Sequence, residues 1–317
     1  MTRFEEQKPD EGDILYLEDT DIPLPDQLNP STRYIHFKTI ARGGKAIIQS
    51  CRDRFLGRVI CYKQLKSEYR NNETEQLRFL REARISALLQ HPATIPTYDL
   101  GRDLRGDLYF TMKLVHGYTL REVLNYRERY DLGRMLNIMI QVGQALAYAH
   151  THGVIHRDIK PENILVGPYG EVLLMDWGLA KVWARETGER VRESTTKQIS
   201  TAPIDTSVTG LGGLEGTVTY MSPEQLEKDP GINGRSDIFS LGVVLYEVVT
   251  GTTPAEAETV LEMQEKILKE QPAPPSSRVR MKVPSLIDDL IMSCLAKAPE
   301  DRPDDCLEIV RLLQEID

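Results

Sequence analysis

The feature of this chain that most constrains its fold is a change of pattern near Gly117. Before this point, short β-rich runs alternate with turn residues. Beyond it, long apolar segments end at glycines, as helices commonly do. Residues 135–153 and 237–251 are two examples. A strand-rich first third followed by a helix-rich remainder predicts an α+β protein with two lobes.

The strand-rich third contains the predicted strands of a single sheet. Residues 34–41, 46–51 and 58–65 are separated by turns, and this arrangement predicts an antiparallel meander. Residues 94–101 and 108–115 are further strand candidates.

A helix is predicted between these two groups of strands, at residues 71–90. Asn72 and Glu75 have the spacing of a capping box, which marks the start of a helix. Apolar residues recur every three or four positions, so one face of the helix is expected to be buried. The residues expected on this face are Leu77, Leu80, Ile85, Leu88 and Leu89.

Composition excludes several classes of protein. The net charge of −9 argues against nucleic acid as the main partner, because phosphate backbones attract clustered Lys and Arg. The four cysteines lack C-x-x-C spacing, which predicts reduced thiols in a cytoplasmic protein rather than disulfides or a zinc site. No apolar run reaches about 18 residues, so no membrane span is expected in this chain.

A polar loop at residues 154–166 carries the residue types that phosphoryl transfer requires. Asp158, Lys160 and Asn163 supply a carboxylate, a cation and an amide oxygen, and Asp176 follows the next apolar strand. A base, a positive charge and two oxygen ligands for a hard cation are what in-line transfer from Mg-ATP needs.

With these motifs, the chain resembles the eukaryotic-like (Hanks-type) bacterial Ser/Thr protein kinases. The resemblance implies a bilobal protein-kinase fold at residues 33–316. Residues 1–32 are rich in Asp, Glu and Pro and lack apolar periodicity, so they are expected to form a flexible acidic arm. It implies a small β-rich N-lobe with one regulatory helix at about 33–115 and a larger helical C-lobe at about 116–316. The activation segment would span residues 176–224.

The family's catalytic roles carry over residue by residue. Lys63 resembles the strand lysine that binds the α- and β-phosphates, and Glu82 resembles the helix glutamate that pairs with it. Asp158 matches the catalytic base, and Lys160 resembles the lysine that steadies the γ-phosphate. A surface lysine and a solvated ion pair within the helix are the simpler interpretations of Lys63 and Glu82. The match to the family favours their pairing with each other.

The cofactors implied by the resemblance are ATP and Mg²⁺, with Mn²⁺ as an alternative metal. Asn163 and Asp176 match the two metal ligands. Met112 would be the gatekeeper, and the backbone of Lys113 and Val115 would contact adenine. The implied ATP site comprises Ile40, Ala41, Arg42, Gly43, Gly44, Ile48, Cys61, Lys63, Met112, Lys113 and Val115.

The chain departs from the family at the phosphate-binding loop. Its G-x-G-x-x-G pattern reads Ala41, Gly43 and Ala46 here, so the loop is compromised but not blocked. Lys45 at the loop tip is interpreted as solvated rather than as a phosphate contact. Ser86 stands where the family packs an apolar side chain against the tryptophan of D-W-G.

The activation segment is expected to be a switch controlled by phosphorylation. Arg157 and Lys181 resemble the family's basic pocket for an activation-loop phosphate. The candidate acceptors are Thr195, Thr196, Thr206, Ser207 and Thr209. Thr217 is interpreted as a structural residue.

Structural residues are also implied by the resemblance. Glu224, Asp237 and Arg302 match the family's anchors, and Arg302 is the expected ion-pair partner of Glu224. His156 and Trp177 are interpreted as packing residues.

The resemblance implies a kinase that phosphorylates Ser and Thr in protein substrates and in its own activation segment, with a homodimer as one route to reaction in trans. The alternative is a pseudokinase or scaffold with weakened ATP binding, supported by Ala41, Ala46 and Ser86. A small-molecule kinase is disfavoured by residues 156–163 together with residues 216–224, because in the family this loop shapes a peptide-binding ledge. The chain is expected to be either a soluble kinase or a shortened piece of a longer one.

Overall fold

The computed structural model describes residues 32–126, 131–182 and 218–316. The chain divides into two compact units. Of the described residues, those from 32 to 148 and from 161 to 180 belong to the first unit, and those from 149 to 160 and from 181 to 316 belong to the second. In the part of the chain that is described, no helix has the length and apolar character needed to cross a membrane.

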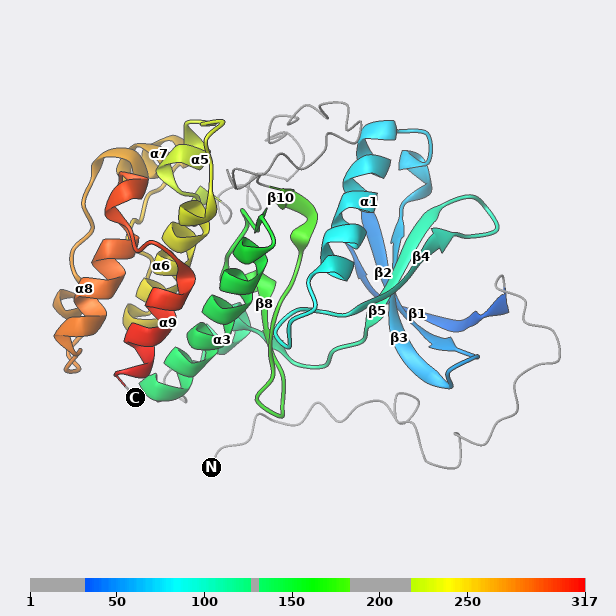
Figure 1. The fold of residues 1–317 in the computed structure, drawn as a ribbon, viewed down its shortest axis with the longest axis horizontal. Coiled ribbons are helices and arrows are strands. Elements are labelled where there is room, and N and C mark those ends of the chain that lie inside the picture. The colour runs from blue at the N-terminus through cyan, green and yellow to red at the C-terminus, as the bar shows by residue number, and fades with distance from the viewer. Residues whose placement is uncertain (1–31, 127–130, 183–217, 317) are drawn as a thin grey trace. The chain divides into compact units, whose positions relative to one another are not determined.

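A five-stranded antiparallel sheet dominates the first unit, with the strand order β1-β2-β3-β5-β4 (Figure 1). The register places Ile48 opposite Lys63 and Cys61 opposite Met112, so these side chains share one face of the sheet. The meander predicted for the first three strands is confirmed. The strands are β1 (Tyr34–Arg42), β2 (Ala46–Asp53), β3 (Arg58–Leu65), β4 (Thr97–Arg102) and β5 (Leu108–Lys113).

Helix α1 (Glu73–Leu88) packs against this sheet and begins as predicted at Asn72, whose side chain accepts a hydrogen bond from the Glu75 amide at 3.1 Å. The second half of the predicted capping box is wrong. The Asn72 amide donates to the carbonyl of Tyr69 at 3.0 Å, and the Glu75 carboxylate contacts Lys45 and Arg78 instead.

The predicted apolar face of α1 is partly wrong. Leu77 and Leu88 are 43% and 51% exposed, whereas Phe79 and Ala83 are buried. The ring of Phe79 packs on Phe110 of β5 with a centroid distance of 5.1 Å. This contact between the helix and the sheet fixes the rotation of α1 about its axis. The spacing of apolar residues along α1 could not predict it, because the partner lies in β5.

The rest of the first unit contains short strands and two helices that follow the large sheet. Strands β6 (Tyr118–Thr119), β8 (Ile164–Val166) and β9 (Val172–Leu174) form a second sheet in the order β6-β8-β9. Helix α2 (Leu120–Leu124) is short, and α3 (Leu132–Thr151) contributes residues 149–151 to the second unit. The 3₁₀ turns are η4 (Ser67–Tyr69), η6 (Pro161–Asn163) and η7 (Trp177–Leu179).

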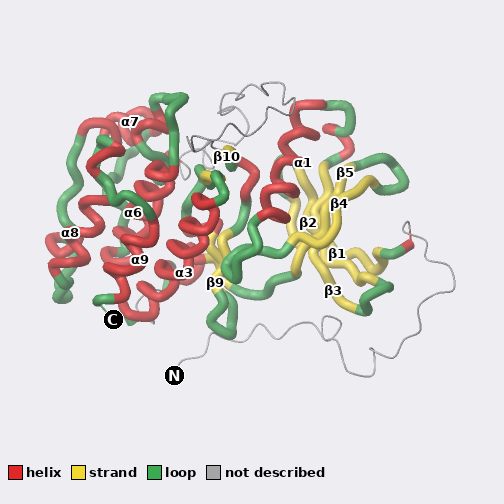
Figure 2. The backbone as a smooth tube through the Cα atoms, in the orientation of Figure 1, coloured by secondary structure: helices red, strands yellow, loops and turns green. Residues whose placement is uncertain are grey.

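The second unit is mainly helical, as Figure 2 shows. Helix α6 (Gly234–Thr250) is buried along almost its whole length and ends at Gly251 with a φ of +83°, the helix stop that the sequence predicted. Strands β7 (Val154–Ile155) and β10 (Lys181–Val182) pair antiparallel. The helices are α5 (Pro223–Leu226), α6 (Gly234–Thr250), α7 (Val260–Lys269), α8 (Ser285–Cys294) and α9 (Cys306–Gln314), with 3₁₀ turns η8 (Pro275–Ser277) and η9 (Pro299–Asp301).

These elements confirm the predicted α+β class. A sheet-rich segment with one long helix on it is followed by a helix-rich remainder. All four cysteines are buried free thiols, as predicted.

Candidate functional site

Lys63 and Glu82 form an ion pair between β3 and α1. Lys63 Nζ lies 2.5 Å from Glu82 Oε1, and both side chains are largely buried. Arg78, one of the alternative partners of Glu82 on the same helix, pairs with Glu75 instead. The predicted pairing of Lys63 with Glu82 is therefore confirmed.

Asp176 lies beside this pair, in a backbone conformation that few residues adopt. Its φ is +59°, and its Oδ1 accepts a hydrogen bond from the Gly178 amide at 3.2 Å, so it caps η7. A Cβ at Gly178 would lie 3.0 Å from Asp176 Oδ1 and 3.7 Å from Glu82 Oε2. A side chain at position 178 would therefore crowd the Asp176 carboxylate and make only an ordinary contact with Glu82. Trp177 is 3% exposed and is a packing residue, as expected.

The charges of Lys63, Glu82 and Asp176 do not balance, because two carboxylates share one largely buried cation. Burial raises the pKa of Glu82, and the nearby charge of Asp176 raises it further, against the opposing effect of Lys63. Burial on its own lowers the pKa of Lys63, but Glu82 and Asp176 outweigh it and the pKa is raised. The arrangement holds Lys63 as a cation and leaves excess negative charge for another cation to neutralise.

Asn163 is brought close to Asp176 by the pairing of β8 with β9. Ile164 lies opposite Leu174, and the Met175 amide donates to the Asn163 carbonyl at 2.8 Å. An amide oxygen and a carboxylate are ligands that suit Mg²⁺, which usually takes one or two carboxylates and completes its shell with water and phosphate oxygens. No group of three or more His, Cys, Asp or Glu side chains that could hold a metal ion lies in the described parts of the chain.

The polar loop of the second unit is held by Asp237 of α6. Its carboxylate accepts hydrogen bonds from the amides of His156 and Arg157, both at 2.8 Å, and contacts His150 Nε2 at 2.8 Å. Burial alone would raise the pKa of Asp237, but the interaction with His150 and the other contacts leave the pKa lowered. His156 is fully buried, as expected for a packing residue. Asp237 thus fixes the backbone that leads into Asp158.

Asp158 and Lys160 contact each other at the end of this loop. Lys160 Nζ donates to both carboxylate oxygens of Asp158, at 2.9 and 2.8 Å. The Asp158 amide donates to His156 Nδ1 at 3.2 Å. The carboxylate is 9% exposed, so it is an oriented, nearly buried acceptor.

Lys181 lies in β10, which pairs with β7, and Arg157 follows β7 by two residues. Lys181 lies opposite Ile155 in the pairing of β10 with β7, and its Nζ donates to the Pro230 carbonyl at 3.1 Å. Arg157 has a φ of +70°, and burial lowers the pKa of its guanidinium. Their role as a phosphate pocket stays a prediction, and the candidate acceptors between residues 183 and 217 lie outside the described residues.

The pair between Glu224 and Arg302 is confirmed. Arg302 donates from Nη1 and Nη2 to the two carboxylate oxygens at 2.7 and 2.9 Å, and the Ser236 hydroxyl adds a bond of 2.5 Å. Burial alone would raise the pKa of Glu224, but these hydrogen bonds outweigh it and leave the pKa lowered.

The candidate phosphate loop connects β1 and β2. The Gly43 amide donates to the Ala46 carbonyl at 2.9 Å, which closes the turn. The interpretation of Lys45 as solvated is wrong, because its Nζ lies 2.8 Å from Glu75 Oε2. The sequence could not show this contact, since it depends on where the first turn of α1 packs.

The predicted residues fall into two groups. The first unit contains the whole implied ATP site together with Glu82, Asn163 and Asp176, and the second contains Asp158, Lys160, Arg157, Lys181 and the three anchors. Their assigned roles stay predictions. Sequence reasoning missed His150, although a histidine near the end of an apolar helix is a recognisable signal for a buried polar partner.

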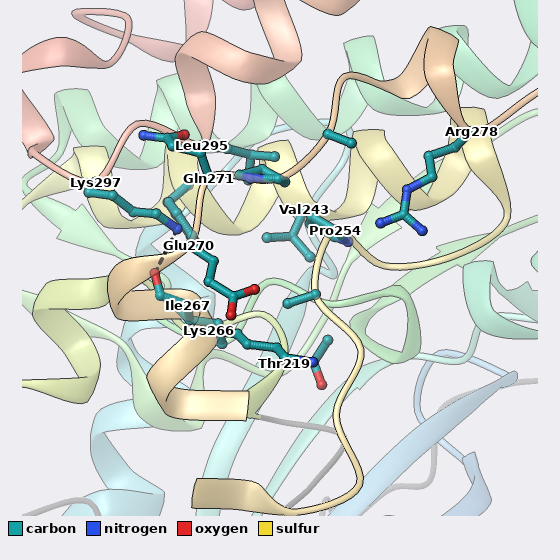
Figure 3. A pocket seen from close by; sticks show the side chains of 14 residues that line it. Thr219, Val243, Pro254, Lys266, Ile267, Glu270, Gln271, Arg278, Leu295 and Lys297 are labelled. Atoms are coloured by element: carbon teal, nitrogen blue, oxygen red, sulfur yellow. Dashed lines mark hydrogen bonds between the residues drawn. The ribbon is translucent and has the colours of Figure 1, made fainter. Parts of the chain in front are cut away.

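A cavity in the second unit contains none of the predicted residues. It is lined by α6, α7 and residues 270–278, and Lys297 donates from its edge to the Ile267 carbonyl at 2.7 Å (Figure 3). Its volume of about 100 Å³ is well below the roughly 300–1,000 Å³ of ligand pockets.

Comparison with known proteins points to one family. A family profile described as the protein kinase domain matches residues 34–313. Serine/threonine-protein kinase PknD of Protochlamydia amoebophila is 33% identical over 93% of this chain and 30% of that protein. Serine/threonine-protein kinase PknB of Mycolicibacterium smegmatis is 34% identical over 86% of this chain and 41% of that protein. A probable serine/threonine-protein kinase of Clostridium acetobutylicum is 30% identical over 90% of this chain and 40% of that protein. The chain thus spans less than half the length of these relatives.

Proposed function

The chain belongs to the protein kinase domain family, and from that premise we propose that it is a Ser/Thr protein kinase that transfers the γ-phosphate of ATP to protein hydroxyls. The observation that carries this proposal is the ion pair between Lys63 and Glu82 beside Asp176. A module that only binds other proteins has no need for a buried cation shared by two carboxylates.

The first unit supplies the groups for the nucleotide. Lys63 is charged and oriented by Glu82, so it can bind the α- and β-phosphates. Asp176 and Asn163 would hold Mg²⁺, or Mn²⁺ in its place, and the metal when bound neutralises charge on the phosphates. The excess negative charge around Glu82 supports this assignment.

The second unit supplies the groups for the acceptor. Asp158 would accept the proton of the substrate hydroxyl, and its amide contact to His156 helps fix the position of its backbone. Lys160 would orient Asp158 and stabilise the γ-phosphate during transfer. Its two hydrogen bonds to Asp158 support the first of these roles.

Substrates and regulation extend the proposal. Ser and Thr of proteins are the proposed acceptors, and nucleic acid is not a proposed partner. The segment between residues 183 and 217 would be phosphorylated by the protein itself, within one chain or between two chains of a homodimer, with the phosphate bound by Arg157 and Lys181. The proposed location is the cytoplasm, where ATP is available.

The test is transfer of labelled phosphate from Mg-ATP to the protein itself and to a generic basic protein. Replacing Asp158 with Asn should reduce transfer by about 100- to 10,000-fold, because the acceptor proton loses its base. The melting temperature of the variant should stay close to that of the wild type. Transfer at the wild-type rate in D158N would refute the assignment of the base.

No transfer from the wild type, even after treatment with an active kinase, would support the pseudokinase alternative. Ala41 and Ala46 would then be the first residues to replace with the glycines of the family pattern, as A41G and A46G.

A further inference from the structure

The tip of the loop between β1 and β2 is held from two sides. Lys66, which follows β3, donates from Nζ to the Gly44 carbonyl at 2.7 Å and from its amide to the Lys45 carbonyl at 2.9 Å. The side chain of Lys45 then reaches Glu75 in the first turn of α1, with 2.8 Å between Nζ and Oε2. Hydrogen bonds therefore hold the backbone of the tip, and an ion pair holds the side chain of Lys45.

Glu75 is a well-placed anchor for this contact. It is only 9% exposed, and its other carboxylate oxygen accepts a hydrogen bond from Arg78 at 2.8 Å. It belongs to the first turn of α1, where the helix dipole stabilises a carboxylate. The anchor is therefore expected to keep its place whether or not Lys45 binds it.

Helix α1 thus contacts two lysines of the sheet region. Glu75 and Glu82 are separated by about two helical turns and project from the same face of α1. Glu82 binds Lys63 in β3, and Glu75 binds Lys45 in the loop. The position of the loop and the position of the Lys63 side chain are consequently set by the same rigid element.

The glycines of the loop do not themselves require this arrangement. A Cβ at Gly44 would meet nothing within 4 Å, and one at Gly43 would lie 3.5 Å from the Ala46 carbonyl, which is an ordinary contact. The contacts of Lys45 and Lys66, together with the hydrogen bond from the Gly43 amide to the Ala46 carbonyl, therefore hold the loop without the special backbone freedom of glycine.

We propose that Lys45 is a positioning residue that connects the phosphate loop to α1, so that the loop is ordered before nucleotide binds. The inference rests on the proposed function, because it takes residues 40–48 as the nucleotide-binding loop. An ordered loop loses less conformational entropy on binding, so its benefit is higher nucleotide affinity rather than faster chemistry.

The test is a double-mutant cycle of K45M and E75Q. Binding of Mg-ADP is measured by calorimetry, and KM for ATP and kcat are measured by phosphate transfer. Each single substitution should weaken Mg-ADP binding and raise KM by about two- to fivefold, the range for a partly exposed ion pair, with kcat nearly unchanged. The double variant should be no worse than either single variant, and K45R should restore most of the affinity.

The sign of the E75Q effect separates this proposal from a direct phosphate contact. If Lys45 bound the phosphates and Glu75 merely competed for it, E75Q would tighten Mg-ADP binding, and that result would overturn the proposal. R78M should leave binding unchanged, which shows that the effect does not come from the other partner of Glu75. The matched control is K269M, which breaks a pair of the same 2.8 Å length with Glu265 on α7.

A second readout needs no nucleotide. Amide hydrogen exchange at residues 43–46 should be faster in K45M and in E75Q than in the wild type, and unchanged in K269M. Equal exchange in all four proteins would overturn the proposal. Nucleotide binding with the expected cycle but no transfer would refute only the kinase activity. Transfer with fully additive single effects would refute only the role of Lys45, and a wild type that binds no nucleotide would refute both.

Discussion

Two ion pairs, one in each unit, have opposite electrostatic character. Glu224 accepts two hydrogen bonds from Arg302 and one from Ser236, so its charge is fully compensated. Glu82 has Lys63 as its cation, and that cation also interacts with the charge of Asp176. The pKa of Glu224 is accordingly lowered, whereas burial and Asp176 leave the pKa of Glu82 raised.

The difference separates a structural contact from a site prepared for a ligand. A compensated pair of charges has nothing further to bind and stabilises the fold around it. An uncompensated pair carries a free-energy cost that a bound cation can remove, which is why perturbed pKa values gather at functional sites. The comparison therefore predicts different consequences when each pair is broken.

The largest effect is expected from R302M. This substitution leaves Glu224 as a buried charge without its cation, and the loss of such a partner costs about 3–5 kcal/mol of unfolding free energy. Urea unfolding followed by circular dichroism measures it. The matched control is D304N, which breaks the exposed ion pair of Asp304 with Arg235 and should cost less than about 1 kcal/mol.

A second variant sharpens this prediction. Replacing both partners, in R302M with E224M, should recover part of the lost stability because no unpaired charge remains buried. If the double variant were less stable than R302M alone, an unpaired buried charge on Glu224 would not be the reason that R302M is destabilised.

The next effect is expected from K63M, and it concerns activity. Phosphate transfer should fall by about 100- to 1,000-fold, because the charge that stabilises the phosphates in the transition state is lost. Stability should fall much less than in R302M, since Glu82 already has a raised pKa and can take up a proton when the cation is removed. Transfer assays and urea unfolding of the same preparation measure both quantities.

K63R provides the conservative control. Arginine keeps the charge but differs in shape and hydrogen-bond geometry, so stability should be retained while transfer is lost. The contrast between the two pairs would disappear if K63M destabilised the protein as much as R302M does.

The smallest effect is a difference in pH dependence. Because the folded pKa of Glu224 lies below its ordinary value of 4.5, the stability it contributes is present above pH 4.5 and is lost as the pH falls through the folded pKa. The stability advantage of the wild type over E224Q should therefore shrink on acidification. The slope cannot exceed about 1.4 kcal/mol per pH unit, since one proton is involved.

Glu82 should behave with the opposite sign. Its folded pKa lies above 4.5, so the folded protein binds the proton more tightly than the unfolded chain does. Between neutral pH and pH 4.5, acidification should therefore favour the wild type relative to E82Q. Urea unfolding from neutral pH to below pH 4.5 tests both variants, since the change for Glu82 falls above pH 4.5 and the change for Glu224 falls below it. Equal signs for the two would show that the pairs are electrostatically alike.

The sequence predicted the elements and the partners of several motifs because these depend on local pattern and on fixed spacing. Strand β3 was predicted with its observed bounds, and the start of α1 at Asn72 follows from its side chain. The pairing of Lys63 with Glu82 and that of Glu224 with Arg302 followed from motifs at family spacing. The roles of these residues in catalysis stay predictions.

Other features could not be predicted because they depend on contacts between distant segments. Leu77 and Leu88 fit the helical period, yet they are exposed because the packing of Phe79 on Phe110 sets the rotation of α1. Glu75 fits a capping box, yet a lysine of the β1–β2 loop lies within reach and binds it.

The sequence by itself determined which groups are present: a lysine in a strand, a glutamate in a helix, and the carboxylates and amide of two loops. Only the tertiary structure decided how those charges compensate one another. The pKa of Glu82 is raised and that of Glu224 is lowered although both are glutamates facing a cation, because charge interactions depend on distance and burial, which sequence order does not specify.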